Sequence, residues 1–218
     1  MRTFAFAIIA GLICLVPAAS SDAASLIDFV GFSWESSGFP TSNAGDQLEL
    51  VARVDGLTNP LSWNPAVNEY TMSVAGLTSL GAEAPDPQNI VVSYVGGQFG
   101  IYEDNLLSGS TAAPGINPPN ATAPTSYQDG ASFLLGDTQE FTIFYNTQFQ
   151  SGAFEASVLF TGGDHHGELG AQTIGYTFGG VFIFGTPEGY DLQWDGQILL
   201  EPVPVEPTTW GDIKSQFR

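Results

Sequence analysis

Basic side chains are almost missing from this chain. Four Lys and Arg residues stand against 23 Asp and Glu residues, for a formal net charge of −19, and none lies between Arg53 and Lys214. Nucleic acids and anionic membranes are bound largely through Lys and Arg that neutralise phosphates. The sequence therefore argues against nucleic acid as a partner. It favours neutral partners, such as a glycan, a protein surface or a second copy of the chain, and cationic ones such as Ca²⁺.

Charge of either sign is scarce overall. Charged residues are 12% of the chain, about half of what soluble domains usually carry. The acidity thus reflects missing bases rather than added acids, which is not the composition of a disordered acidic tail. With 43% hydrophobic and 12% aromatic residues, the composition is that of one globular domain with a substantial core.

Cysteine occurs once, as Cys14, inside an N-terminal segment typical of an export signal. Arg2 precedes an apolar run from Phe4 to Ala19, and small residues follow. We expect residues 1–24 to be a signal peptide that is removed. The run is shorter than the roughly 20 residues that span a bilayer, so we expect no membrane span after processing. The mature protein, secreted or on the cell surface, then has no disulfide and depends on core burial.

Helical periodicity is missing from the body, which instead alternates apolar and polar residues in short segments rich in Val, Ile, Phe, Tyr and Thr. Short strands at regular spacing predict an antiparallel fold. The ten segments predicted as strands are Leu26–Trp34, Gln47–Val54, Glu69–Val74, Asn89–Val95, Gln98–Glu103, Ala131–Leu135, Glu140–Phe149, Ala153–Thr161, Tyr176–Phe184 and Asp191–Leu200.

Short segments that contain glycine add turn signals to these strands. We predict tight reversals at Gly96-Gly97, at Asp195-Gly196 and at Gln150-Ser151-Gly152, because hairpin turns need positive φ. Gly179-Gly180, inside an apolar strand, predicts a bulge or a close backbone approach. The whole pattern predicts an all-β domain over residues 25–201, an antiparallel β-sandwich of jelly-roll type with about ten strands.

The C-terminal end reads as a separate unit. Prolines recur through residues 202–207 and predict an extended spacer. Residues 208–218 predict a short amphipathic helix whose apolar face carries Trp210, Ile213 and Phe217, with Lys214 and Arg218 near its C-terminus. This ending resembles the short Trp-Gly-x-Ile-Lys tails that close some secreted bacterial β-sandwich proteins. The resemblance itself carries no established role. Because a proline-rich spacer sets the segment apart from an exported domain, we expect it to serve in attachment or sorting.

Candidate metal ligands cluster in one glycine-rich loop, as Asp164, His165, His166 and Glu168. Imidazole and carboxylate groups together suit Zn²⁺ or Cu²⁺, but adjacent residues rarely reach one ion. An oxygen-ligand Ca²⁺ site that uses Asp164 and Glu168 is a second interpretation. A polar surface loop without metal is the third and the favoured one. No cofactor is therefore predicted, and Ca²⁺ is kept as the alternative.

Three tryptophans, Trp34, Trp63 and Trp194, are candidates for sugar stacking, and Trp63 stands out because it lies in a proline-flanked loop. Sequence motifs for nucleophilic serine, zinc-protease, P-loop and dinucleotide sites are absent. The leading hypothesis is therefore an exported, non-catalytic surface or matrix protein. A carbohydrate-binding module is the alternative. A glycoside-hydrolase-like enzyme, which needs two facing carboxylates, is a further one.

Overall fold

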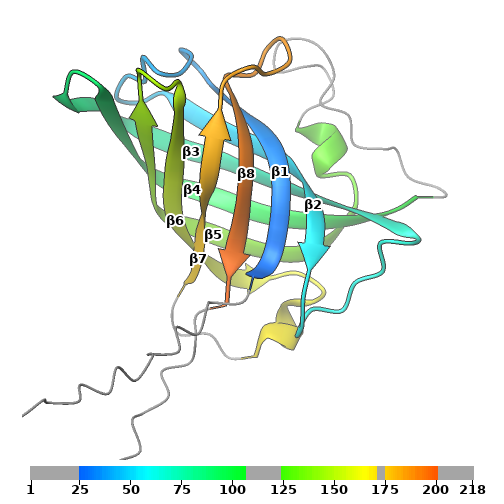
Figure 1. Cartoon of the computed structure of the whole chain (residues 1–218). Coiled ribbons are helices and arrows are strands. Elements are labelled where there is room, and N and C mark those ends of the chain that lie inside the picture. Colours follow the sequence, from blue (N-terminus) through cyan, green and yellow to red (C-terminus); the bar gives the residue numbers. More distant parts are fainter. Residues whose placement is uncertain (1–24, 107–123, 171–174, 201–218) are drawn as a thin grey trace, which may run out of the picture.

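The computed structural model describes residues 25–106, 124–170 and 175–200, which form one closed barrel of antiparallel strands (Figure 1). The strands follow one another around the barrel in chain order, and β8 returns to pair with β1. The strands are β1 Ser25–Glu35, β2 Gln47–Leu57, β3 Asn68–Asp86, β4 Asn89–Asn105, β5 Ala131–Asn146, β6 Ser151–Gly162, β7 Tyr176–Ile183 and β8 Leu192–Leu199. Two 3₁₀ helices, η1 Thr125–Tyr127 and η2 His166–Leu169, lie in connections. Over the described ranges no helix is long and apolar enough to cross a membrane.

The predicted ten-strand sandwich is wrong, because two pairs of predicted strands are single long strands in one closed sheet. Gly96-Gly97 lies inside β4, whose register with β5 is the same at Tyr94 and at Gln98. Both glycines have positive φ, 76° and 104°, yet they bend the strand without reversing it. The two segments predicted on either side of Gly136 likewise fuse into β5.

Of the other turn and backbone predictions, one is wrong and two are confirmed. Asp195-Gly196 lies in the middle of β8, so the reversal predicted there is wrong. The reversal near Gln150, whose φ is 51°, is confirmed between β5 and β6. The close backbone approach predicted at Gly179-Gly180 is confirmed too, since a Cβ on Gly180 would lie 2.2 Å from the Asp195 carbonyl oxygen.

Aromatic side chains fill the barrel. Inward positions alternate along each strand, as the pleat requires, and β1, β5, β6, β7 and β8 bring Phe29, Phe141, Phe154, Phe178 and Trp194 together. The Phe154 and Trp194 ring centroids are 4.5 Å apart, and those of Phe154 and Phe178 are 5.3 Å apart. An eight-stranded barrel is just wide enough for side chains to fill it. The interior is therefore core, and sites must lie at the ends or on the outer wall.

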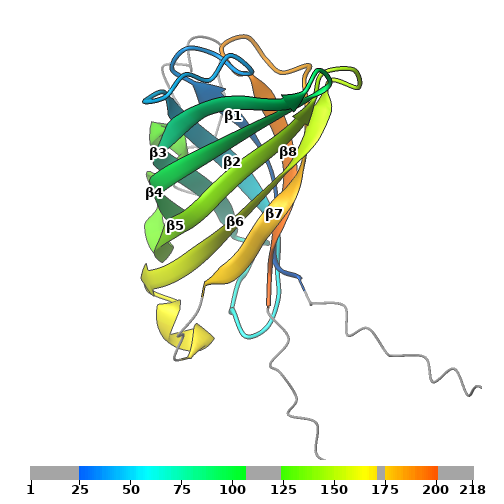
Figure 2. The ribbon, with the colours of Figure 1, turned by 90° about the vertical axis from the view of Figure 1, so that its left-hand side faces the viewer.

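The two ends of the barrel differ. Ser25 pairs with Leu199, so the first and last strands begin and end together at one end, which also carries the β2–β3 connection and η2. The other end carries the β1–β2, β3–β4, β5–β6 and β7–β8 connections (Figure 2). The expected signal peptide at 1–24, spacer at 202–207 and tail helix at 208–218 lie outside the described residues.

Candidate functional site

A cleft of about 300 Å³ opens at the end of the barrel that holds Ser25 and Leu199. It forms where β2 ends, the β2–β3 connection crosses, and β3 begins. Its lining residues are Arg53, Val54, Asp55, Trp63, Pro65, Asn68, Glu69, Tyr70 and Leu106. The cleft thus joins one indole to a guanidinium, two carboxylates and an amide.

Tyr70 holds Trp63 in place at this cleft. The two rings meet edge-on with centroids 5.7 Å apart, and Tyr70 packs in the same manner on Phe133. The Tyr70 hydroxyl donates to Glu103 Oε1 at 3.0 Å and accepts the Asn64 backbone N–H at 2.8 Å. Burial raises the pKa of Tyr70, so the phenol stays a donor. Trp63 itself is half-buried and packs against Tyr70.

Arg53 and Glu69 form the charged wall of the cleft. Arg53 Nε and Nη2 both donate to Glu69 Oε1, at 3.2 and 2.5 Å. The Arg53 side chain is 54% exposed and that of Glu69 is 8% exposed. The hydrogen bond that Arg53 donates to Glu69 raises the pKa of Arg53. Arg53 is the only Lys or Arg within the described parts of the chain, so the single cation of the barrel is oriented in this cleft.

Such a lining suits hydroxyl-bearing ligands. A flat aromatic face covers the apolar side of a sugar ring, while planar guanidinium and carboxylate groups pair with neighbouring hydroxyls. The charged and amide side chains in the lining are those of Arg53, Asp55, Asn68 and Glu69. They can donate hydrogen bonds to ligand hydroxyl groups and accept hydrogen bonds from them.

The loop of candidate metal ligands does not converge on one point. His165 Nδ1 lies 3.0 Å from Glu168 Oε1, and its Nε2 lies 3.8 Å from Glu103 Oε2. His166 Nε2 instead contacts the Phe160 carbonyl oxygen at 3.1 Å. Throughout the described ranges no three His, Cys, Asp or Glu side chains are placed to hold a metal ion, Asp164 included.

Glu168 connects two loops beside the cleft. Its Oε2 accepts the Ser62 backbone N–H at 2.6 Å while Oε1 faces His165. His165 in turn stacks on Phe133, with ring centroids 4.1 Å apart. The Ser62 hydrogen bond lowers the pKa of Glu168. Glu168 therefore links the β2–β3 connection, which contains Trp63, to the β6–β7 connection.

The other two tryptophans are placed elsewhere. Trp194 has no exposed surface and lies in the aromatic core, which removes it from the candidate ligand contacts. Trp34 lies half-buried on the outer wall, edge-on to Tyr190 with centroids 5.5 Å apart. Of the three, Trp63 is the one found in the lining of the cleft described above.

A second groove of about 300 Å³ lies on the outer wall over β3, β4 and β5, near Gln98, Gln128 and Asp137. Its aromatic residues are Phe99, which is buried, and Tyr102. The Tyr102 ring lies over Gly100, where a Cβ would meet the Tyr102 hydroxyl oxygen at 2.6 Å. The ring therefore covers its own strand, which leaves the Trp63 cleft as the stronger candidate.

A buried polar cluster, which no sequence motif predicts, lies at the opposite end of the barrel. Ser42 donates to Glu35 Oε1 at 2.6 Å and lies 2.8 Å from the Ser79 hydroxyl, and the Glu35 N–H donates to Asp191 Oδ2 at 2.8 Å. Burial raises the pKa of both Glu35 and Asp191, and it raises that of Tyr94 as well. These residues lie far apart in sequence and share no motif, so no local pattern could have found them.

Comparisons with protein-family models, curated proteins and solved structures gave no match for this chain.

Proposed function

We propose that this protein is an exported, non-catalytic binding protein whose Trp63 cleft takes a neutral carbohydrate. The observation that supports the proposal is the indole of Trp63, held by Tyr70 beside the Arg53–Glu69 pair in one cleft. A chain of net charge −19 repels acidic polysaccharides and is compatible with neutral ones. The packed interior leaves the barrel end as the place for a ligand.

The decisive experiment is titration of the protein with neutral oligosaccharides, followed by calorimetry or chemical-shift changes. Trp63→Ala is expected to weaken binding on the order of tenfold or more, because truncation of a central aromatic contact typically costs that much. Trp34→Ala is the matched control, since Trp34 is also half-buried but lies on the outer wall. Equal affinity in both variants, or no binding by the parent protein, would refute the proposal.

Two other experimental results would point to a different function. Release of new reducing ends from the oligosaccharide would make the protein a glycoside hydrolase, with Asp55 and Glu69 as the carboxylates to replace first. Binding to a protein surface but to no glycan would favour a matrix protein that recognises other proteins. Export forms a separate part of the proposal and is checked by comparing the chain with and without residues 1–24 in culture medium.

A further inference from the structure

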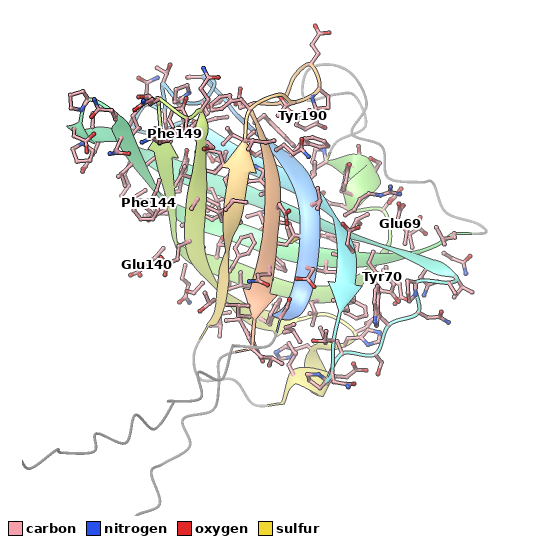
Figure 3. All side chains as sticks on the ribbon, in the orientation of Figure 1. Glu69, Tyr70, Glu140, Phe144, Phe149 and Tyr190 are labelled. Atoms are coloured by element: carbon pink, nitrogen blue, oxygen red, sulfur yellow. The ribbon has the colours of Figure 1, made fainter. Side chains whose placement is uncertain are left out.

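An apolar row crosses the outer wall of the barrel on four neighbouring strands. Val91, Phe144, Ala153 and Val181 are successive register partners on β4, β5, β6 and β7. Phe144 is 46% exposed and Val181 is 56% exposed. Ile183 on β7 and Phe149 in the β5–β6 turn lie close to this row and are also exposed. In Figure 3, Phe149 and Phe144 lie on the same side of the barrel.

The row has a groove beside it and acids around it. The groove, about 460 Å³, lies over β4, β5 and β6, with Ile90, Val91, Phe144 and Ala153 in its lining. Glu155 lies two positions from Ala153 on the same face of β6, and Asp195 is the register partner of Val181 on β8. Exposed apolar rows rimmed by charge are typical of surfaces that bind another segment.

The chain itself supplies a segment of matching length. The described residues stop at Leu200, directly after β8, and Leu199 pairs with Thr177 on β7. Val181 lies four residues along β7, about 13 Å at strand spacing. The seven residues 201–207, with three prolines, reach about 22 Å when extended. The segment that follows can therefore lie on the row.

The composition of that segment matches the row as well. Trp210, Ile213 and Phe217 have helical spacing, and Lys214 and Arg218 are two of the four basic residues of the chain. A helix over 208–218 is about 16 Å long, and the row across four strands is about 14 Å wide. Apolar side chains would meet the row, and the two cations would face Glu155 and Asp195.

We propose that the C-terminal segment 208–218 docks on its own barrel, with its apolar face across Val91, Phe144, Ala153 and Val181. A large side chain such as that of Trp210 fits the groove beside Phe144. In the docked state the segment covers exposed apolar surface and is withheld from any external receptor. This proposal is independent of carbohydrate binding, since the row and the Trp63 cleft share no residue.

Disulfide trapping in the full chain tests the docking directly. Cys14→Ser removes the only cysteine, and Ile213→Cys is then combined with Val181→Cys. Val67→Cys is the matched control, a valine of comparable exposure in the β2–β3 connection. We expect an intramolecular disulfide with Val181→Cys at a rate at least about tenfold above the control. Phe144→Ser is expected to lower that rate on the order of tenfold, as loss of a central aromatic contact does.

Every other result counts against the proposal. Equal trapping at both positions would mean that the segment only samples the surface. A disulfide formed solely between two chains would assign the row to a second copy. An unchanged rate in Phe144→Ser, or in Lys214→Glu with Arg218→Glu at low salt, would refute the apolar and the electrostatic contributions respectively. Because Val181 and Phe144 are exposed, the melting temperature should stay near that of the parent, which confirms that each variant folds.

Discussion

Gly196 on β8 leaves the space that the Phe154 ring occupies inside the barrel. A Cβ on Gly196 would lie 2.8 Å from the tip of Phe154 and 2.5 Å from the tip of Phe29. Gly180, its register partner on β7, is equally close to its neighbours, since a Cβ there would meet Gly196 Cα at 2.5 Å. The two glycines therefore allow an eight-stranded barrel to hold a core of large rings.

This packing predicts a strong effect of one methyl group. Gly196→Ala should lower the free energy of unfolding by about 1–3 kcal/mol, because overpacking forces rings and backbone to shift. Gly167→Ala is the control, since nothing lies within 4 Å of a Cβ at that position. Urea unfolding of both variants measures the difference. Equal midpoints would show that the core is looser than the structure indicates.

The buried carboxyl of Glu35 predicts a gain in stability from its amide analogue. Glu35 is 5% exposed, Oε2 has no hydrogen-bond partner in the described structure, and burial raises its pKa. A raised folded-state pKa means that the group contributes stability below its unfolded pKa of about 4.3 and that this contribution is lost as pH rises through the folded pKa. Glu35→Gln keeps the acceptor for Ser42 and removes the buried charge. Its melting temperature should exceed that of the parent at pH 7 and match it more closely near pH 4. A lower melting temperature at pH 7 would contradict this account.

For Glu168 we expect the opposite dependence of its stability contribution on pH. The Ser62 backbone N–H lowers the pKa of this exposed carboxylate, so its contribution is present above the unfolded pKa and is lost as pH falls through the folded value. Glu168→Gln should loosen the β2–β3 connection above pH 5 and have little effect at pH 3. Hydrogen exchange of the Ser62 amide measures the change, and protection that stays the same at neutral pH would rule out the link.

The Arg53–Glu69 pair predicts separable effects on stability and binding. Arg53→Gln removes both donated hydrogen bonds to a nearly buried carboxylate, which should cost about 1–2 kcal/mol of unfolding free energy. It should also weaken the proposed binding of a carbohydrate, since the cleft loses its guanidinium. Asp28→Asn provides a control on a neighbouring strand outside the cleft lining. Binding that is unchanged in Arg53→Gln would leave Trp63 as the sole recognised contact.

The sequence predicted strands better than it predicted their closure. Alternation located all eight strands, because inward and outward residues differ along each one. It could not show that β1 meets β8, since that pairing joins residues at opposite ends of the described chain. Positive φ at Gly96 was inferable, but whether a strand bends or reverses there depends on Phe99 and Leu77 packing into the core.

The candidate site was predictable only in part. Trp63 was singled out by its loop, whereas Arg53, Glu69 and Tyr70 belong to strands and carry no motif. Only the barrel brings them beside the indole. The adjacent histidines suggested a metal centre, but their side chains diverge, His165 toward Glu168 and His166 toward the Phe160 carbonyl. The direction in which each loop side chain points is set by tertiary contacts, and the spacing of residues in the sequence does not reveal it.

The pairing of β1 with β8 also makes closure of the barrel a late step of folding during synthesis. As the chain emerges from its N-terminal end, β1 is available early, but it gains its second partner only when Leu199 has followed. Until then β1 and the latest strand both present unpaired edges, which are prone to pair with other chains. The barrel is thus completed in one late step, and a truncation anywhere before β8 should aggregate rather than yield a smaller stable domain.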